Sequence, residues 1–294
     1  MNHAILGVGG VGGLMAASLA RIGENVVLVL RHESLAEYPE QLRLESPFGN
    51  FVAHFATAEK VPAVDVLWLA VKAPQLDASL AAIDDLSLPR AIVPLLNGVD
   101  HVALLRSRYG AECVIPATIA VESERVAPGH IVHRSPFANL NIAPGGRDLL
   151  QDIVNRLQQL GFKCRFQDDE ATLLWSKLVF LAPIALTTTA SGKNTSEVAS
   201  DPQWSKHLQA SVRETASVGL AEGAKLDAEK VIAMISAMPS GLRSSMQKDV
   251  EQGRPPELDA IGGAVLRGAR KHALTVPVTQ ELVTMVETKI RQSM

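Results

Sequence analysis

Three glycines near the start of the chain have the spacing found in dinucleotide-binding proteins. The segment GVGGVG places Gly7, Gly9 and Gly12 in the pattern G-x-G-x-x-G, between an apolar run and a helical pattern. The first glycine allows a tight turn, the second lets the backbone approach a pyrophosphate, and the third lets the helix lie close to the strand. The pyrophosphate would bind unpaired N–H groups at the helix N-terminus. We therefore expect a dinucleotide site that includes Gly10 and Val11, with a glycine-rich turn as the alternative.

The second apolar run ends in VLVLRHE, and its charged residues bear on which dinucleotide binds. NAD enzymes usually carry an acidic residue about 20 residues after the glycines, where it holds the ribose 2′-hydroxyl. Arg31 stands in this region instead, and a guanidinium can bind the 2′-phosphate of NADP with two hydrogen bonds. We predict NADP as the cofactor. Two alternatives stay open, namely Arg31 as an ordinary surface residue and Glu33 as the partner of a ribose.

A single ammonium stands in the most apolar stretch of the chain. Lys177 is the only charged residue between Ala171 and Gly192. A helix lysine is usually solvated, but a solvated helix face of this length would carry more charges. A positioned ammonium can stabilise negative charge on a carbonyl oxygen and then donate a proton. The apolar run LLWSKLVFLAPIAL is too short to span a membrane, which takes about 20 residues, so we expect a buried core helix.

The composition is that of an ordinary globular enzyme. The 294 residues include 28 basic and 31 acidic side chains, and the net charge of -3 shows no excess of positive charge for nucleic acid. The opening MNHAILGVGG lacks the pattern of a signal peptide. The cysteines and histidines fit no disulfide or metal spacing. We expect a cytoplasmic protein that binds no nucleic acid, membrane or metal.

Apolar runs alternate with helical patterns as far as residue 167, which indicates a parallel sheet covered by helices on both faces. Strands are expected at 3–7, 25–30, 64–72, 91–98, 112–120 and 162–167, and the segments 129–134 and 138–144 look like a hairpin. After residue 167, apolar residues recur at three- and four-residue spacing, which indicates helices. The sequence therefore predicts the α/β class, with a Rossmann-type doubly wound sheet in residues 1–167 and an all-helical domain in residues 168–294.

Four further stretches resemble those of the ketopantoate reductases (2-dehydropantoate 2-reductases). They are RIGENVVLVLRHE, VKAPQ, LLNGV and LLWSKL, the last followed downstream by SSMQKDVEQGRPPELDAIGGAVLRGARKHAL. Their order and spacing run the full length of the chain. The resemblance implies reduction of a 2-oxo acid by NADPH in a cleft between two domains, the second with a 6-phosphogluconate-dehydrogenase-like architecture. The product would be (R)-pantoate, for pantothenate and coenzyme A biosynthesis.

The resemblance also implies roles for individual residues. It places Lys72 and Asn97 beside the cofactor. It places Ser245 and Glu257 at the substrate, with Lys177 as the acid. Lys177 would be the proton donor, with Glu257 keeping it charged and contacting both the nascent hydroxyl and the cofactor. Asn97 would touch the cofactor and the substrate, while Asp249 matches the motif without a clear role. Without the resemblance, the Asn97-Gly98 pair would indicate a turn and Glu257 a favourable helix start.

The helix that carries the lysine departs from the family pattern. Ketopantoate reductases usually have asparagines four and eight residues after the lysine, on the same face, which help to hold the substrate's terminal hydroxyl. Here these substrate-binding positions are Leu181 and Ala185. A buried hydroxyl without a hydrogen-bonding partner costs about 1–3 kcal/mol. The alternative function is therefore a related NADPH-dependent reductase of a more apolar 2-oxo acid. Hydroxyls of residues 187–189 are candidates to replace the missing amides.

Two further expectations concern the same helix and the function as a whole. Pro183 should kink or break the helix. A non-catalytic NADP-binding sensor is a third candidate function, but the retention of Lys177, Ser245 and Glu257 speaks against it, because a sensor needs no proton donor. The oligomeric state stays open, with a homodimer as one option.

Overall fold

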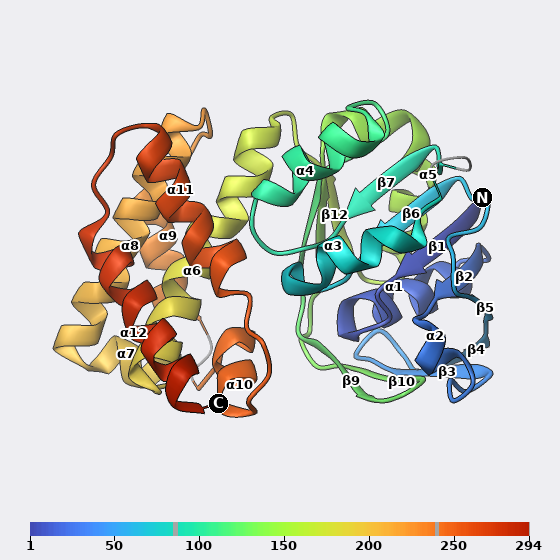
Figure 1. The fold of residues 1–294 in the computed structure, drawn as a ribbon, viewed down its shortest axis with the longest axis horizontal. Helices are drawn as coiled ribbons and strands as arrows, with labels where there is room; N and C mark the ends of the chain where they lie inside the picture. Colours follow the sequence, from blue (N-terminus) through green and yellow to red (C-terminus); the bar gives the residue numbers. More distant parts are fainter. Residues whose placement is uncertain (85–87, 239–240, 294) are drawn as a thin grey trace. The chain divides into compact units, whose positions relative to one another are not determined.

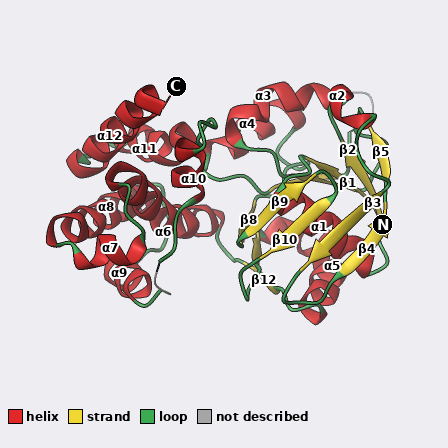
Figure 2. Ribbon diagram, turned by 90° about the horizontal axis from the view of Figure 1, so that it is seen from below, coloured by secondary structure: helices red, strands yellow, loops and turns green. Residues whose placement is uncertain are grey.

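The computed structural model describes residues 1–84, 88–238 and 241–293. The chain forms two compact units, one of Met1–Leu96 and His101–Asp168, the other of Asn97–Asp100 and Asp169–Met294. We call them the sheet unit and the helical unit, and Figures 1 and 2 show the elements of each. The predicted boundary after residue 167 lies next to this division. The sequence did not indicate that residues 97–100 pack with the helical unit.

A five-stranded parallel sheet organises the sheet unit, in the order β5-β2-β1-β6-β7. Its strands are β1 (Asn2–Leu6), β2 (Asn25–Val29), β5 (Ala56–Ala58), β6 (Val66–Leu69) and β7 (Ala91–Pro94). The chain passes from β1 through helix α1 (Gly10–Arg21) to β2, continues outward to β5, and returns on the other side of β1 at β6. In open α/β sheets, ligands bind outside the carboxyl ends of the strands where the order reverses. This reversal lies beside the end of β1.

Both faces of the parallel sheet are buried, which explains why its strands are continuous apolar runs. Ile5, Leu28 and Trp68 face one core, which they share with residues of α1. Leu6 and Val29 face the opposite core. The helical segments on that side are α3 (Leu76–Ser79) and α4 (Asp100–Tyr109). The predicted α/β class with a Rossmann-type sheet is confirmed.

Two smaller sheets complete the sheet unit. The first has the order β4-β3-β10-β9 and packs on α1; its strands are β3 (Gln41–Glu45), β4 (Phe51–His54), β9 (Ser123–Ala127) and β10 (His130–His133). The second has the order β12-β11-β8; its strands are β8 (Ala117–Ala120), β11 (Asn139–Ile142) and β12 (Lys163–Phe166), and helix α5 (Arg147–Gln159) packs on β12. The strands β3, β4, β5 and β9 were not predicted.

The predicted hairpin of segments 129–134 and 138–144 is wrong. The strand β10 pairs with β3 and β9, whereas β11 pairs with β8 and β12, so the two neighbours in sequence belong to different sheets. Apolar spacing shows that a segment is a strand but does not identify its partner. The strand β9 directly precedes its partner β10 in the chain, whereas β3 lies far away in sequence, as Ile131 beside Leu44 illustrates.

Helix α6 (Glu170–Ser191) is the central element of the helical unit. Around it pack α7 (Thr195–Ser200), α8 (Pro202–Ala221), α9 (Ala228–Ser236), α10 (Ser245–Glu251), the π-helix η4 (Asp259–Gly263) and α12 (Pro277–Ser293), while α11 (Ala264–Lys271) packs on α8, η4 and α12. Among the described residues α6 is the one helix long and apolar enough to cross a membrane, and 67% of its apolar window is buried within the protein. This is the environment of a core helix.

The ends of α6 have defined caps, and Pro183 does not interrupt it. The side chain of Asp169 accepts a hydrogen bond from the backbone of Thr172 at the start, and Gly192 ends the helix with a φ of 75°. Pro183 was predicted to kink or break the helix; the break is wrong, because the helix continues through Pro183. A proline removes one backbone hydrogen bond, and the apolar contacts on both sides of α6 hold the helix across this gap.

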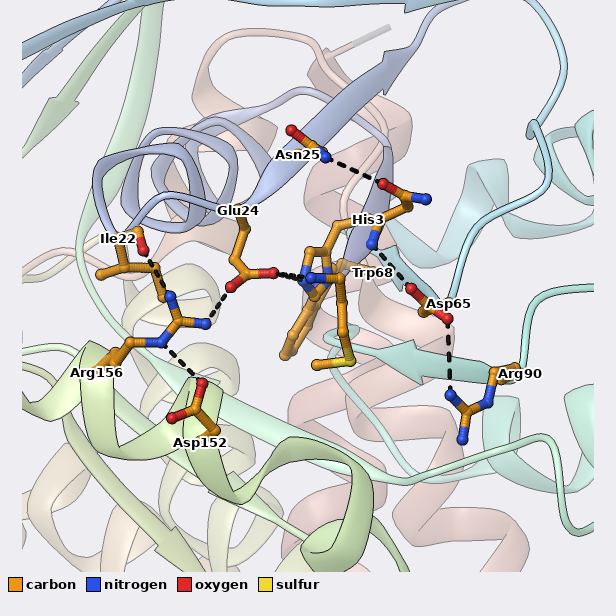
Figure 3. A network of polar contacts seen from close by, with 11 residues as sticks. His3, Ile22, Glu24, Asn25, Asp65, Trp68, Arg90, Asp152 and Arg156 are labelled. Carbon is orange, nitrogen blue, oxygen red and sulfur yellow. Dashed lines mark hydrogen bonds and ion pairs between the residues drawn. The ribbon is translucent and has the colours of Figure 1, made fainter.

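A buried polar network lies at the amino end of the parallel sheet (Figure 3). The carboxylate of Glu24 accepts from the amino group of Met1 at 2.6 Å and pairs with the guanidinium of Arg156. The buried His3 ring accepts from Trp68 Nε1 at 3.2 Å and places its Nε2 3.2 Å from Glu24. Burial raises the pKa of Glu24, but the hydrogen bonds from Met1, Arg156 and His3 lower it to about 2. The network ties β1, β6 and α5 together.

Candidate active site

The glycine segment at the end of β1 has the geometry that a dinucleotide fingerprint requires. Gly7 has a φ of +98°, which side chains rarely adopt. A Cβ on Gly12 would lie 2.0 Å from the carbonyl oxygen of Gly7, and one on Gly10 would lie 2.0 Å from that of Ser123. A Cβ on Gly9 would meet no atom within 4 Å. Protein packing therefore explains Gly7, Gly10 and Gly12, whereas Gly9 leaves open space next to the backbone.

The N-terminus of α1 meets this open space. Gly9 is the N-cap of α1, no side chain caps the helix, and its first turn holds no acidic residue. The first N–H groups of a helix have no partner within the helix, and together with the helix dipole they attract anions. Gly10, Val11 and Gly12 form this turn. The residues present therefore fit a pyrophosphate.

Two basic residues follow neighbouring strands of the sheet. Arg31 comes after β2 and is the N-cap of α2 (His32–Leu35). Its guanidinium pairs with Glu33 at 3.2 Å, and its side chain is 77% exposed. Lys72 comes after β6 and is exposed. The carboxyl ends of parallel strands lie at one edge of a sheet, so both residues belong to the edge that carries the glycine segment. The Arg31–Glu33 pair is weak because it is solvated, and a phosphate could displace Glu33.

Lys177 lies in the first half of α6, and its side chain is half-buried. It makes no hydrogen bond or close ion pair with any residue that the structure describes. Burial lowers the pKa of the Lys177 ammonium to about 8, and the negative charge of Glu257 opposes this effect. A partly buried lysine whose pKa is lowered to about 8 is suited to give up a proton during a reaction.

Glu257 and Asn97 are joined directly. Glu257 is 8% exposed, and its Oε2 accepts a hydrogen bond from Nδ2 of Asn97 at 2.7 Å. Asn97 follows β7 in the chain, and Gly98 after it has a φ of +87°. The turn chemistry of an Asn-Gly pair and a role for the asparagine side chain thus coexist in the same residues. The helical unit brings together Asn97, Lys177 and Glu257, three of the predicted site residues.

The hydroxyl groups near the end of α6 are partly committed to the protein itself. Thr187 and Thr188 donate to the backbone oxygens of Pro183 and Ile184 at 2.6 and 2.7 Å. The hydroxyl of Thr188 also lies 2.8 Å from that of Ser244. The predicted site residue Ser245 comes next in the chain, as the first residue of α10, and it is exposed. The Thr189 hydroxyl is buried and has no hydrogen-bonding partner among the described residues.

The face of α6 that carries Lys177 is apolar beyond the lysine. Leu181 is half-buried and Ala185 is 1% exposed, and both contact the same hydrophobic cluster. Residues spaced by four lie one above the other on a helix, so hydrocarbon follows the ammonium along this face. Neither side chain can hold a substrate hydroxyl.

Asp249 supports the loop that leads to Glu257. Its carboxylate is nearly buried and accepts from Nε of Arg254 at 2.9 Å. Its backbone oxygen accepts from the N–H of the same arginine at 2.8 Å. These bonds close the turn after α10, three residues before Glu257. They give Asp249 a structural role that the sequence had left open.

The sequence did not single out Arg267 or Gly98. A Cβ on Gly98 would lie 2.3 Å from the carbonyl oxygen of Ala260, and the guanidinium of Arg267 binds Asp100 and Asp259. The stretch ELDAIGGAVLRGAR contained the only signal, an aspartate and an arginine eight residues apart on a helical pattern. The partner Asp100 lies too far away in sequence to be found from that pattern.

A cavity of about 240 Å³ lies elsewhere in the helical unit, among α6, α7, α8 and α9. Ile184 lines it from α6 together with Thr187 and Thr188, two of the candidate hydroxyl residues, whereas Lys177, Ser245 and Glu257 do not line it. Among the residues that the structure describes, no three His, Cys, Asp or Glu side chains are grouped so as to hold a metal ion. The predicted site residues offer an ammonium, a carboxylate, an amide and a hydroxyl group.

Comparisons with known proteins identify the family of the chain. Residues 3–146 match the family of ketopantoate reductases PanE/ApbA, and residues 169–290 match its C-terminal part. The 2-dehydropantoate 2-reductase of Caulobacter vibrioides is 30% identical over 291 residues, which cover 96% of this chain and 97% of that protein. A 2-dehydropantoate 2-reductase of Mycobacterium tuberculosis is 29% identical, with coverage of 96% of each chain. A D-mandelate dehydrogenase solved with NADH and anilino(oxo)acetate has the same fold, with a TM-score of 0.88, 22% identity and coverage of 100% and 99%.

Proposed function

The chain belongs to the ketopantoate reductase family, and we propose that it reduces 2-dehydropantoate to (R)-pantoate with NADPH. The reaction would be a cytoplasmic step of pantothenate and coenzyme A synthesis. Membership of this family supports the assignment of the chain as an oxidoreductase that uses a nicotinamide cofactor and acts on a small 2-oxo acid. The observation that carries the proposal is the group of Lys177, Glu257 and Asn97 in the helical unit, where burial holds the pKa of the lysine at about 8.

Each residue has a defined task in this reaction. When bound, NADPH supplies the hydride that reduces the carbonyl carbon. Lys177 stabilises the negative charge that builds on the carbonyl oxygen and transfers its proton to that oxygen. Glu257 favours the charged lysine and accepts a hydrogen bond from the new hydroxyl. Ser245 donates a hydrogen bond to the substrate carboxylate, and Asn97 orients Glu257 through their shared hydrogen bond.

The cofactor would bind the sheet unit. The N–H groups of Gly10, Val11 and Gly12 would hold the pyrophosphate beside the open space at Gly9. Arg31 would bind the 2′-phosphate of NADPH bidentately, and Lys72 would lie beside the cofactor at the end of β6. On the helical unit, Asn97 and Glu257 would both contribute to the site that the resemblance assigns to them.

A second candidate is a reductase of the same family that acts on a more apolar 2-oxo acid. The apolar face formed by Leu181 and Ala185 favours it, because a site that lacks a partner for the terminal hydroxyl of ketopantoate loses about 1–3 kcal/mol of binding. The D-mandelate dehydrogenase of the same fold, which has been solved with anilino(oxo)acetate, supports keeping this candidate. The same structure contains NADH, so NADH belongs in every assay.

The decisive experiment is a substrate panel. The purified full-length chain is assayed for NADPH and NADH oxidation with ketopantoate, 2-oxoisovalerate, 2-oxoisocaproate and phenylglyoxylate. The first candidate requires the highest kcat/KM with ketopantoate and NADPH, and a preference for an apolar acid would replace it with the second. No turnover with any acid would contradict both. Light scattering of the same sample gives the oligomeric state, which we propose is a homodimer.

A further inference from the structure

The segment Asn97–Asp100 is attached to the helical unit at both of its ends. At its start, Asn97 donates to Glu257 at 2.7 Å. In its middle, Gly98 lies so close to η4 that a Cβ would stand 2.3 Å from the carbonyl oxygen of Ala260. At its end, Asp100 Oδ2 accepts from Arg267 Nη2 at 2.7 Å and from Nε at 3.1 Å. The position of the Asn97 amide therefore depends on contacts with η4 and Arg267.

Arg267 also binds Asp259, which lies two residues after Glu257 in the chain. Its Nη1 donates to Oδ1 of Asp259 at 2.6 Å, and its Nη2 donates to the backbone oxygen of Asp259 at 2.9 Å. Asp259 begins the π-helix η4, two residues after Glu257. A Cβ on Gly263 would lie 2.5 Å from Asp259 Oδ1 and 3.0 Å from Arg267 Nη1, so this glycine leaves room for the contact. One guanidinium thus joins the segment that carries Asn97 to the turn that carries Glu257.

The exposure of these groups argues against a mainly stabilising role. The side chains of Arg267 and Asp100 are 37% and 52% exposed, and that of Asp259 is 86% exposed. Solvated ion pairs contribute little to folding. What the planar guanidinium adds is geometry, because it binds two carboxylates and a carbonyl oxygen in fixed directions. Short π-helices are frequent at functional sites, and here one lies between the arginine and Glu257.

We propose that Arg267 is a positioning residue, which holds Asn97 and Glu257 in the geometry that the reaction of Lys177 requires. This inference rests on the proposed function of the Lys177 site, although Arg267 contacts neither Lys177 nor Glu257 itself. Without the guanidinium, the segment Asn97–Asp100 loses the contact at its end, and the Asn97 side chain no longer fixes the direction of the Glu257 carboxylate. The charge of Glu257 raises the pKa of Lys177. A displaced Glu257 carboxylate should therefore change the pKa of the lysine.

The test compares Arg267→Gln with a matched control in the same unit. Arg213 binds Glu229 through Nε and Nη2 at 2.7 and 3.2 Å, with exposures of 50% and 68%, so Arg213→Gln removes a similar exposed pair. With the best 2-oxo acid of the panel, Arg267→Gln should lower kcat at least about tenfold and leave KM for NADPH within about twofold. Arg213→Gln should change neither. Both variants should unfold within a few degrees of the wild type. Arg267→Lys should restore little, since an ammonium cannot bridge the same groups.

A second measurement does not depend on turnover. The titration of Lys177 is followed by NMR on ¹³C-methylated lysines, with Lys177→Arg identifying the resonance. In Arg267→Gln the midpoint should move to lower pH, because the carboxylate of Glu257 is held less firmly near the lysine; in Arg213→Gln it should stay. A kcat and a midpoint equal to those of Arg213→Gln would overturn the proposal. An inactive wild type whose midpoint still moves in Arg267→Gln would count against the proposed function and leave the positioning role standing.

Discussion

The side-chain amide of Asn97 lies 2.7 Å from Oε2 of Glu257, although 160 positions separate the two residues in sequence. Glu257 in turn opposes the effect of burial on the pKa of Lys177. Residues from three distant segments therefore interact in the helical unit, where we propose that they bind the substrate. Each of their proposed roles can be tested separately.

Replacement of the proton donor should affect chemistry and spare cofactor binding. Lys177→Ala removes general-acid catalysis, which typically contributes 10²–10⁴-fold, so kcat should fall by about that factor. The dissociation constant for NADPH, measured by fluorescence titration, should change less than about threefold. The exposed Lys206, on α8 of the same unit, provides the control Lys206→Ala. Equal losses of kcat and NADPH affinity would contradict the assigned role.

The pH profile of kcat should have an alkaline limb set by Lys177. The protonated lysine is the donor, so activity is present below its pKa of about 8 and is lost as pH rises through that value. Burial lowers this pKa, and Glu257 raises it. Glu257→Gln removes the opposing charge and should move the limb to lower pH, in addition to any loss of rate. A limb at the same pH in both proteins would show that Lys177 is not the titrating group.

Cofactor choice should depend on Arg31. A charge-assisted hydrogen bond contributes about 1.5–3 kcal/mol, so Arg31→Ala should raise KM for NADPH by about ten- to hundredfold. NADH has no 2′-phosphate, and its KM should change little. Glu33→Gln is the control, because it removes the partner of Arg31 and keeps the guanidinium. If KM for NADH rises as much as that for NADPH, Arg31 does not bind the 2′-phosphate.

Substrate preference should respond to the two apolar positions on α6. The double variant Leu181→Asn and Ala185→Asn introduces amides on the face of Lys177 and supplies partners for a terminal hydroxyl. The ratio of kcat/KM for ketopantoate to that for 2-oxoisocaproate should rise by about ten- to hundredfold, which corresponds to about 1–3 kcal/mol. An unchanged ratio in a folded variant would mean that this face does not contact the substrate side chain.

Acid stability should depend on the network around Glu24. The pKa of this carboxyl is lowered from 4.5 to about 2 in the folded protein, which corresponds to about 3 kcal/mol. Since the folded pKa is the lower one, the contribution is complete above pH 4.5 and is lost as pH falls toward 2. Glu24→Gln should therefore lower the free energy of unfolding at neutral pH, and its difference from the wild type should shrink on acidification. Glu229→Gln, in an exposed pair, should cost less than about 1 kcal/mol at either pH.

Local patterns predicted the strand, the glycine turn and the helix at the start of the chain, because these parts are close in sequence. The glycines, the strand before them and the helix after them occupy a single short segment, and Gly12 has a local steric reason in the carbonyl oxygen of Gly7. The pairing of strands was less predictable. The segment 129–134 was identified as a strand, but one of its two partners, β3, is an alternating strand that lies far away in sequence. A local pattern contains no information about such a partner.

The sequence by itself determined the α/β class, the Rossmann-type sheet and the family. Burial patterns and short motifs depend on residues that are close together in the chain, so they can be read from the amino-acid sequence. Only the tertiary structure decided that Asn97 bonds to Glu257, that Asn97–Asp100 packs with the helical unit, and that Arg267 joins Asp100 to Asp259. The depressed pKa of Lys177 belongs to the same group, because burial and a carboxylate from another segment set it together. Hydrogen bonds and electrostatic interactions act over a few ångströms whatever the separation in sequence, so they exist only once the chain has folded.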